Sequence, residues 1–194
     1  MALQLAEEKG QLDSDTSKGW RIKPENFKKN YTPVEHPKGT FLLYEIRWGK
    51  SPKTWKKWCT NDDNHHAEIN FIEKAWQEKN CHRTMPCSVT WFLSWSPCEE
   101  CSWFIIEFLK KYPKVTLDIR ASRLYRDCEQ QTGLKELVKR GVNISIMHMG
   151  DYNYCWRIFV DHQRNQDQDN HYMGFSRKIC DWNEKLHSIL DESS

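Results

Sequence analysis

The chain has 194 residues, of which 38% are hydrophobic, and its 29 Lys and Arg against 27 Asp and Glu give a formal net charge of +2. This length predicts one domain with a sizeable core. No apolar run approaches the roughly 18 residues of a membrane-spanning helix, so the sequence predicts no transmembrane helix. The small net charge does not by itself point to a polyanionic partner.

Residues 1–19 are predicted to be a flexible polar leader, and residues 20–190 to form the single domain. The first fifteen residues are too acidic, and their apolar stretch is too short, for a secretory signal peptide. We therefore expect a reducing compartment, in which the eight cysteines are free thiols or metal ligands rather than disulfides. The expected locations are the nucleus and the cytoplasm.

The first half of the chain predicts a short helix, a loop and a hairpin. Pro24 suits a helix start, and this helix is expected to end near Asn30. A loop with two prolines and a glycine follows over 32–40. The segments 41–48 and 53–60 read as two strands of a hairpin, and a turn at 61–64 leads into a helix that begins near His66.

The second half alternates strands and helices, which predicts neighbouring parallel strands with both faces covered. The polar segment 163–170 reads as a connector. The whole order predicts a five-stranded mixed sheet with the hairpin at one edge and about six helices. The expected strands are 88–95, 115–121 and 142–147, and the expected helices are 98–112, 133–140 (closed by Gly141), 152–162 and 174–190.

Residues 18–57 form a basic block with eleven Lys and Arg against three Glu. A basic surface with interleaved aromatic rings suits a phosphate backbone and stacked bases. This pattern predicts contact with a single-stranded nucleic acid, and the alternative is the solvated basic face of an ordinary sheet. The interleaved aromatic residues are Trp20, Tyr31, Trp48, Trp55 and Trp58.

The most specific pattern is His66-x-Glu68, followed after 28 residues by Pro97-Cys98-x-x-Cys101. Residues i and i+3 lie on one face of a first helical turn, where the helix N-terminus favours thiolates. One imidazole and two thiols leave a fourth position open for water, and a carboxylate beside that water can act as a base. The pattern therefore favours a catalytic zinc site.

Less specific interpretations of the same residues exist. The cysteines could belong to a structural zinc site with a fourth Cys or His, or could be ordinary buried residues. His65 adjoins the proposed ligand, but only His66 has the spacing to Glu68. Three further aromatic residues are expected in the core rather than at a substrate: Trp91, Trp103 and Trp156.

Five stretches within residues 41–160 resemble the AID/APOBEC family of polynucleotide cytidine deaminases, whose signature is H-x-E with P-C-x-x-C. The residues of the first and third stretches, 41–49 and 88–101, are most similar to the apolipoprotein B mRNA-editing branch of this family. The resemblance implies a cytidine deaminase-like three-layer α/β/α fold. The stretches are FLLYEIRWG at 41–49, HAEINFIEK at 66–74, SVTWFLSWSPCEEC at 88–101, SRLYRDCEQQTGLKEL at 122–137 and GVNISIMHMGDYNYCWRIFV at 141–160.

The resemblance also implies hydrolytic deamination of cytosine to uracil in a single strand. Zn²⁺ would be held by His66, Cys98 and Cys101, and Glu68 would move protons between the attacking water and the base. Segment 126–128 matches no specificity loop of the family, so the preferred 5′ base stays open. The residues implied in substrate binding are Trp95, Ser96, Tyr125, Asn61, Arg123 and Arg126.

The leading hypothesis is a deaminase of single-stranded DNA, with RNA as a second substrate. Cofactor-assisted mRNA editing is one alternative, and a nucleic-acid-binding restriction factor with a structural zinc is another. Deamination of free cytidine is disfavoured by the basic block and by the loop of Tyr125. The expected partners are single-stranded DNA or RNA, no membrane is expected, and the protein is expected to be a monomer or a weak dimer.

Overall fold

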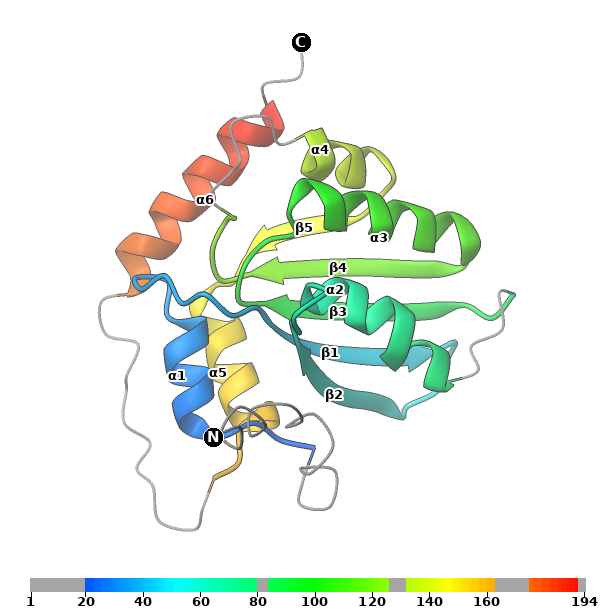
Figure 1. Ribbon diagram of the computed structural model, residues 1–194, viewed down its shortest axis with the longest axis horizontal. Helices are drawn as coiled ribbons and strands as arrows, with labels where there is room; N and C mark the ends of the chain where they lie inside the picture. Colours follow the sequence, from blue (N-terminus) through cyan, green and yellow to red (C-terminus); the bar gives the residue numbers. More distant parts are fainter. Residues whose placement is uncertain (1–19, 80–83, 126–131, 163–174, 192–194) are drawn as a thin grey trace, which may run out of the picture.

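A computed structural model describes residues 20–79, 84–125, 132–162 and 175–191 (Figure 1). The predicted leader, the predicted connector at 163–170 and Arg126 lie outside these ranges. The division between a leader and a domain at residue 20 therefore stays a prediction. Within the described ranges, no helix combines the length and hydropathy that crossing a bilayer requires.

Five strands form one mixed sheet in the order β2-β1-β3-β4-β5. Strand β1 is antiparallel to both β2 and β3, whereas β3, β4 and β5 are mutually parallel. The predicted mixed sheet with a hairpin at one edge is thus confirmed. The strands are β1 (Phe41–Trp48), β2 (Thr54–Thr60), β3 (Cys87–Leu93), β4 (Val115–Ala121) and β5 (Asn143–Ile146).

Six α-helices accompany the sheet in the described residues, as predicted. The predicted start of the helix at 152 is three residues late, because His148 caps α5. The His148 ring Nδ1 accepts a hydrogen bond from the backbone of Asp151 (3.3 Å), and the Asp151 carboxylate accepts one from the backbone of His148 (3.0 Å). The helices are α1 (Pro24–Tyr31), α2 (Ala67–Asn70), α3 (Glu99–Lys111), α4 (Thr132–Lys139), α5 (Met149–Phe159) and α6 (Phe175–Asp191).

The sheet separates two hydrophobic cores, which confirms the three-layer arrangement. Helices α2, α3 and α4 cover one face, and α1 and α5 lie against the other (Figure 1). Tyr44 of β1 packs with Phe71 and Trp91 in the first core. Leu43, which precedes Tyr44 in β1, lies in the second core with Phe92. This alternation is the period-2 pattern of a strand buried on both faces.

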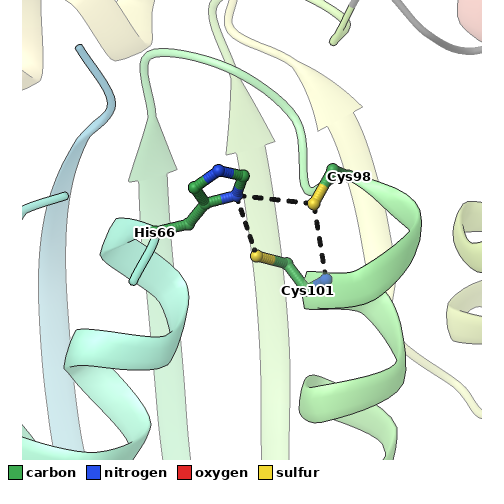
Figure 2. Close-up of side chains that lie close together, drawn as sticks. All are labelled: His66, Cys98 and Cys101. Atoms are coloured by element: carbon green, nitrogen blue, oxygen red, sulfur yellow. Dashed lines mark hydrogen bonds between the residues drawn. The ribbon is translucent and has the colours of Figure 1, made fainter. Parts of the chain in front are cut away.

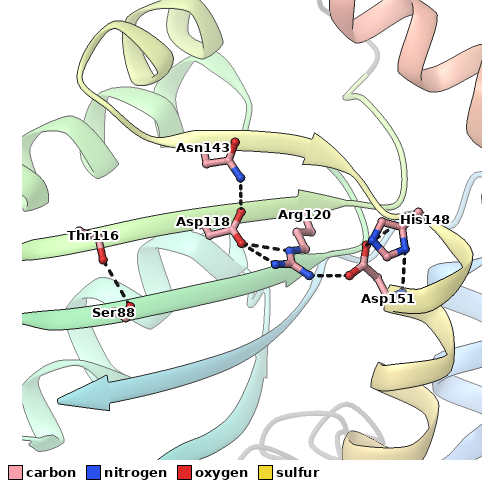
Figure 3. A network of polar contacts seen from close by, with 7 residues as sticks. All are labelled: Ser88, Thr116, Asp118, Arg120, Asn143, His148 and Asp151. Atoms are coloured by element: carbon pink, nitrogen blue, oxygen red, sulfur yellow. Dashed lines mark hydrogen bonds and ion pairs between the residues drawn. The ribbon is translucent and has the colours of Figure 1, made fainter. Parts of the chain in front are cut away.

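A polar network fixes the start of α5 to the sheet (Figure 3). Arg120 of β4 donates to Asp151 of α5 (2.6 Å) and to Asp118 of its own strand (2.8 and 3.0 Å). Asn143 of β5 donates to the other Asp118 oxygen (2.8 Å). Each carboxylate is therefore paired, which offsets the cost of placing Asp151 in a buried position.

Helix α3, which Cys98 caps and which contains Cys101, packs closely on α4 at Gly133. The Gly133 backbone donates to the Glu99 carboxylate (2.8 Å), and a Cβ atom at Gly133 would lie 2.6 Å from the Ser102 Cβ. Only glycine therefore permits this approach of α4 to α3.

Gly133→Ala is expected to lower the free energy of unfolding by about 1–3 kcal/mol, because the added methyl group overlaps Ser102. Urea denaturation would measure the change. Gly39→Ala is the matched control, since its Cβ would be 3.6 Å from the nearest atom. Helix propensity alone favours alanine by about 1 kcal/mol, so an increase in stability would contradict the predicted overlap.

Candidate metal centre and its surroundings

Three side chains of the motif converge at the carboxyl end of the parallel strands (Figure 2). His66 is the N-cap residue of α2, which follows β2, and Cys98 is the N-cap residue of α3, which follows β3. Cys101 lies in the first turn of α3, and its backbone N–H lies 3.5 Å from the Cys98 sulfur. The predicted helix start at 98 is therefore one residue early, and the capping geometry brings the two sulfurs together.

The three ligand atoms have the spacing that a tetrahedral zinc ion requires. His66 Nδ1 lies 3.4 Å from each of the two sulfur atoms, and all three atoms lie within 4.8 Å of one another. Atoms bound at the usual Zn–N and Zn–S lengths of about 2.0 and 2.3 Å are separated by about 3.5 Å for N and S. The residues present therefore fit a zinc ion with three protein ligands.

The cysteine pair holds a negative charge that is suited to a cation. The pKa of the Cys98 thiol is lowered to about 5, first by its hydrogen bond with the Cys101 thiol and then by the Cys101 backbone and His66. The pKa of Cys101 is raised, first by the same hydrogen bond and then by burial. A divalent ion bound to both sulfurs would stabilise both thiolates.

Glu68 is a buried carboxylate with an unsatisfied oxygen in the same site. Its side chain is on the first turn of α2, is 2% exposed, and Oε2 has no hydrogen-bond partner in the described structure. Burial raises the pKa of Glu68 to about 7, and the charge of Cys98 adds to this rise. An unsatisfied buried carboxylate is costly, and this one shares its site with the three candidate metal ligands.

Helix α2 is held against β2 by two side chains. The Cys59 thiol donates to the Ala67 carbonyl (3.4 Å), and Asn70 donates to the Thr60 carbonyl (2.9 Å). After Asn70 the helix widens into a π-helical stretch, Phe71–Ala75, where the sequence predicted a regular helix. Such widened turns are frequent at functional sites, and here the change lets both Phe71 and Trp76 enter the core.

Aromatic rings form a wall beside the triad. The Tyr125 ring centroid lies 6.3 Å from that of His66 and 6.5 Å from that of Trp95, against which it packs edge to face. Ser96 accepts a hydrogen bond from the Tyr125 backbone at its hydroxyl (3.0 Å). The Trp95 indole donates to the Pro37 carbonyl (3.1 Å). The structure thus places Tyr125 next to both His66 and Trp95, and Ser96 supports the backbone at Tyr125.

Arg123, predicted to contact the substrate, is instead buried beneath this wall. Its side chain is 0% exposed, and its guanidinium carbon lies 4.4 Å from the centre of the Trp95 ring. It donates to three backbone carbonyls, those of Asn30, Thr32 and Glu35. Burial lowers the pKa of Arg123 to about 10, which still leaves it cationic at neutral pH. Arg123 therefore supports the wall rather than the substrate.

Arg123→Met is expected to lower the free energy of unfolding by about 3 kcal/mol or more, because the buried guanidinium and its hydrogen bonds to three backbone carbonyls are lost together. Urea denaturation would measure the loss. Arg177→Met, at an exposed position of α6, is the matched control and should be nearly neutral. Equal stability of the two variants would show that the buried bonds contribute little.

Asn61 is another residue that the resemblance implies in substrate binding, and it bonds to the backbone before β1. The Asn61 amide oxygen accepts from the Thr40 backbone (2.8 Å), which fixes the entry to β1 near the site. The sequence predicts only a connecting loop over 32–40, yet His36 in this segment packs against Trp95 with a centroid distance of 5.8 Å. No pattern in the sequence marks that contact.

The burial of two aromatic residues differs from the prediction. Trp103, predicted in the core, is 44% exposed, and Tyr31, predicted on a basic surface, is buried.

Comparison with known proteins places residues 30–162 in the APOBEC4-like AID/APOBEC deaminase family. The chain is 47% identical over 160 residues to the human C→U-editing enzyme APOBEC-1, covering 81% of this chain and 67% of that protein. It is 50% identical over 149 residues to opossum (Monodelphis domestica) APOBEC-1, covering 76% and 63%. It is 36% identical over 152 residues to the mouse DNA dC→dU-editing enzyme APOBEC-3, covering 72% and 34%. The matched part thus spans about two thirds of each APOBEC-1 relative.

Proposed function

The chain belongs to the AID/APOBEC family of deaminases, and from this premise we propose that it converts cytosine to uracil in single-stranded DNA. The reaction consumes one water: an oxygen atom adds to C4 of the base, the bond from C4 to the exocyclic nitrogen breaks, and ammonia leaves. Each turnover therefore needs a group that accepts a proton from water and returns protons to nitrogen.

Glu68 is the observation that carries this proposal. Its carboxylate is buried beside the three ligand atoms and has an oxygen without a partner. A pKa near 7 lets one carboxyl group accept and release protons at neutral pH. Glu68 would take the first proton from the attacking water and deliver protons to the ring nitrogen and then to the departing amine.

His66, Cys98 and Cys101 would hold the zinc ion. When bound, zinc supplies a Lewis acid that lowers the pKa of a water from about 15.7 toward about 7. His66 would offer Nδ1, the nitrogen that faces both sulfurs, to the ion, which would leave the ring proton on Nε2. Because His66 and Cys98 are the N-cap residues of two helices, the backbone fixes the positions of both ligands.

Tyr125 and Trp95 would bind the target base. A base placed against an aromatic wall gains about 1–3 kcal/mol from stacking. Because the Tyr125 ring adjoins His66, a base stacked against Tyr125 would lie next to the metal ligands. A cytosine must leave its stack to enter, which favours a single strand over a duplex.

A structural zinc site, as in a binding protein without catalysis, fits these residues less well. Structural sites usually have four protein ligands, and in the described residues the group contains His66, Cys98 and Cys101 alone. A zinc site with a purely structural role would also gain no stability from the unpaired oxygen of Glu68.

Sequencing the products of a randomised single-stranded DNA pool, treated with the full chain, tests the proposal. We expect C→T changes in the DNA pool and few in the same pool made double-stranded. A matched RNA pool runs in parallel, because the APOBEC-1 relatives are C→U-editing enzymes and show higher identity than the DNA-editing APOBEC-3. Changes in RNA alone would replace DNA by RNA as the substrate, and changes in neither pool would contradict deamination.

A further inference from the structure

Five exposed cations gather at the end of the sheet opposite the metal centre. We call Arg47, Lys50, Lys53, Lys111 and Lys114 the distal basic cluster; all five are exposed.

Three segments bring these cations to one place. The β1–β2 turn is bonded to the residue before β3, since the Gly49 backbone donates to the Pro86 carbonyl (2.8 Å). The start of β3 is bonded to the α3–β4 connection, since the Cys87 backbone donates to the Lys114 carbonyl (3.1 Å). In Figure 1 this end lies at the right, where β3 and β4 begin.

The positive charge of this cluster is not neutralised within the described part of the chain. None of the five cations forms an ion pair there. The carboxylates of neighbouring elements pair with other lysines: Glu45 with Lys56 (3.4 Å), Glu78 with Lys57 (3.8 Å) and Glu107 with Lys110 (2.5 Å). A local excess of unpaired cations attracts polyanions.

Two large apolar side chains are exposed near the cluster. Trp55 of β2 is 39% exposed, and Met85, which precedes β3, is 43% exposed. Cations interleaved with an accessible aromatic ring favour single-stranded nucleic acid, in which phosphates and unpaired bases lie side by side.

The cluster is too far from the metal centre to contact the target nucleotide. Strand β1 runs between the two ends, and its eight residues cover about 25 Å at 3.3 Å per residue. His66 and Cys98 lie beyond the opposite ends of β2 and β3. A short strand seated at the metal centre therefore cannot reach the cluster, whereas a long strand can.

We propose that the distal basic cluster binds the phosphate backbone of the substrate strand at a distance from the target cytosine. This inference rests on the proposed function, because it takes the polyanion to be the substrate itself. The consequence is an affinity that depends on strand length, with the cluster contributing only to strands long enough to span the protein.

The test compares two variants that each remove three positive charges. One is Lys50→Gln, Lys53→Gln, Lys114→Gln in the cluster; the matched control is Lys139→Gln, Lys178→Gln, Lys185→Gln, at exposed positions of α4 and α6. Fluorescence anisotropy would give the Kd of each full-length protein for single-stranded DNA of about 5 and about 40 nucleotides, over a range of salt concentrations.

For the long strand, the cluster variant is expected to bind about tenfold more weakly, with a salt slope smaller in magnitude by about 2 for three lost phosphate contacts. Its affinity for the short strand should match that of the parent, and the control variant should match it for both strands. Unchanged long-strand affinity, or an equal loss for both lengths, would overturn the proposal.

Vesicles containing phosphatidylserine provide a second arm. Weaker vesicle binding by the cluster variant with unchanged DNA affinity would assign the cluster to anionic membranes and overturn the proposal.

Deamination of the short strand separates the proposed function from the proposed role of the distal basic cluster. A parent chain that deaminates neither strand contradicts the proposed function, while the affinity ratio between long and short strands still decides the role of the cluster.

Discussion

Glu68→Gln is expected to slow uracil formation by about 10²- to 10⁴-fold while zinc stays bound. The amide keeps the shape of the side chain but cannot take a proton from water. It is not one of the three ligand residues, so metal content should not change. The variant should also melt no lower than the parent, because a neutral amide replaces a buried carboxylate with an unsatisfied oxygen.

Uracil release from a labelled single-stranded oligonucleotide would measure the rate, and elemental analysis the zinc content. Glu73→Gln is the matched control, since Glu73 is exposed on the same helical segment. A Glu68→Gln protein with the parental rate would remove Glu68 from proton transfer. A variant that loses its zinc would instead make Glu68 part of the metal site.

Cys101→Ser is the second change with a large expected effect: zinc content should fall from about one ion per chain toward zero, and activity should be lost with it. Only three ligands serve the ion, and a serine hydroxyl does not replace a thiolate. Cys101 is fully buried, so no exposed group can take its place.

Added zinc gives a readout that does not depend on activity. At about 100 times its Kd, a ligand stabilises the folded protein by about 2.7 kcal/mol, so zinc should raise the Tm of the metal-free parent but not that of Cys101→Ser. Cys180→Ser, at an exposed position of α6, is the matched control and should behave as the parent. Full zinc content in Cys101→Ser would show that the ion binds elsewhere.

The sequence predicted the elements whose boundaries are set locally. The expected strands at 41–48 and 115–121 match β1 and β4, because apolar residues with β-propensity are bounded there by Gly and Pro. The grouping of His66 with Cys98 and Cys101 was also predictable, since the short motif fixes the ligands at two helix starts.

Features that depend on distant contacts could not be predicted. Arg123 follows a strand and resembles a residue at a substrate groove, but three carbonyls some 90 positions earlier take up its guanidinium. The π-helical stretch after Asn70 places both Phe71 and Trp76 in the core, a spacing that a 3.6-residue periodicity does not encode. The apolar composition of the helix predicted a buried position for Trp103, but this residue lies on the side of α3 that faces solvent.

The anchoring of the segment before β1 has a consequence for divergence and for engineering. Arg123 holds this segment through main-chain oxygens of Asn30, Thr32 and Glu35, and Trp95 adds the oxygen of Pro37. Since every residue type offers the same carbonyl, the anchor does not depend on the side chains of Thr32, Glu35 and Pro37, whereas Tyr31 between them is buried in the core. An inserted or deleted residue would shift the bonded oxygens relative to one another, so we expect this segment to accept substitutions at those three positions more readily than a change in length.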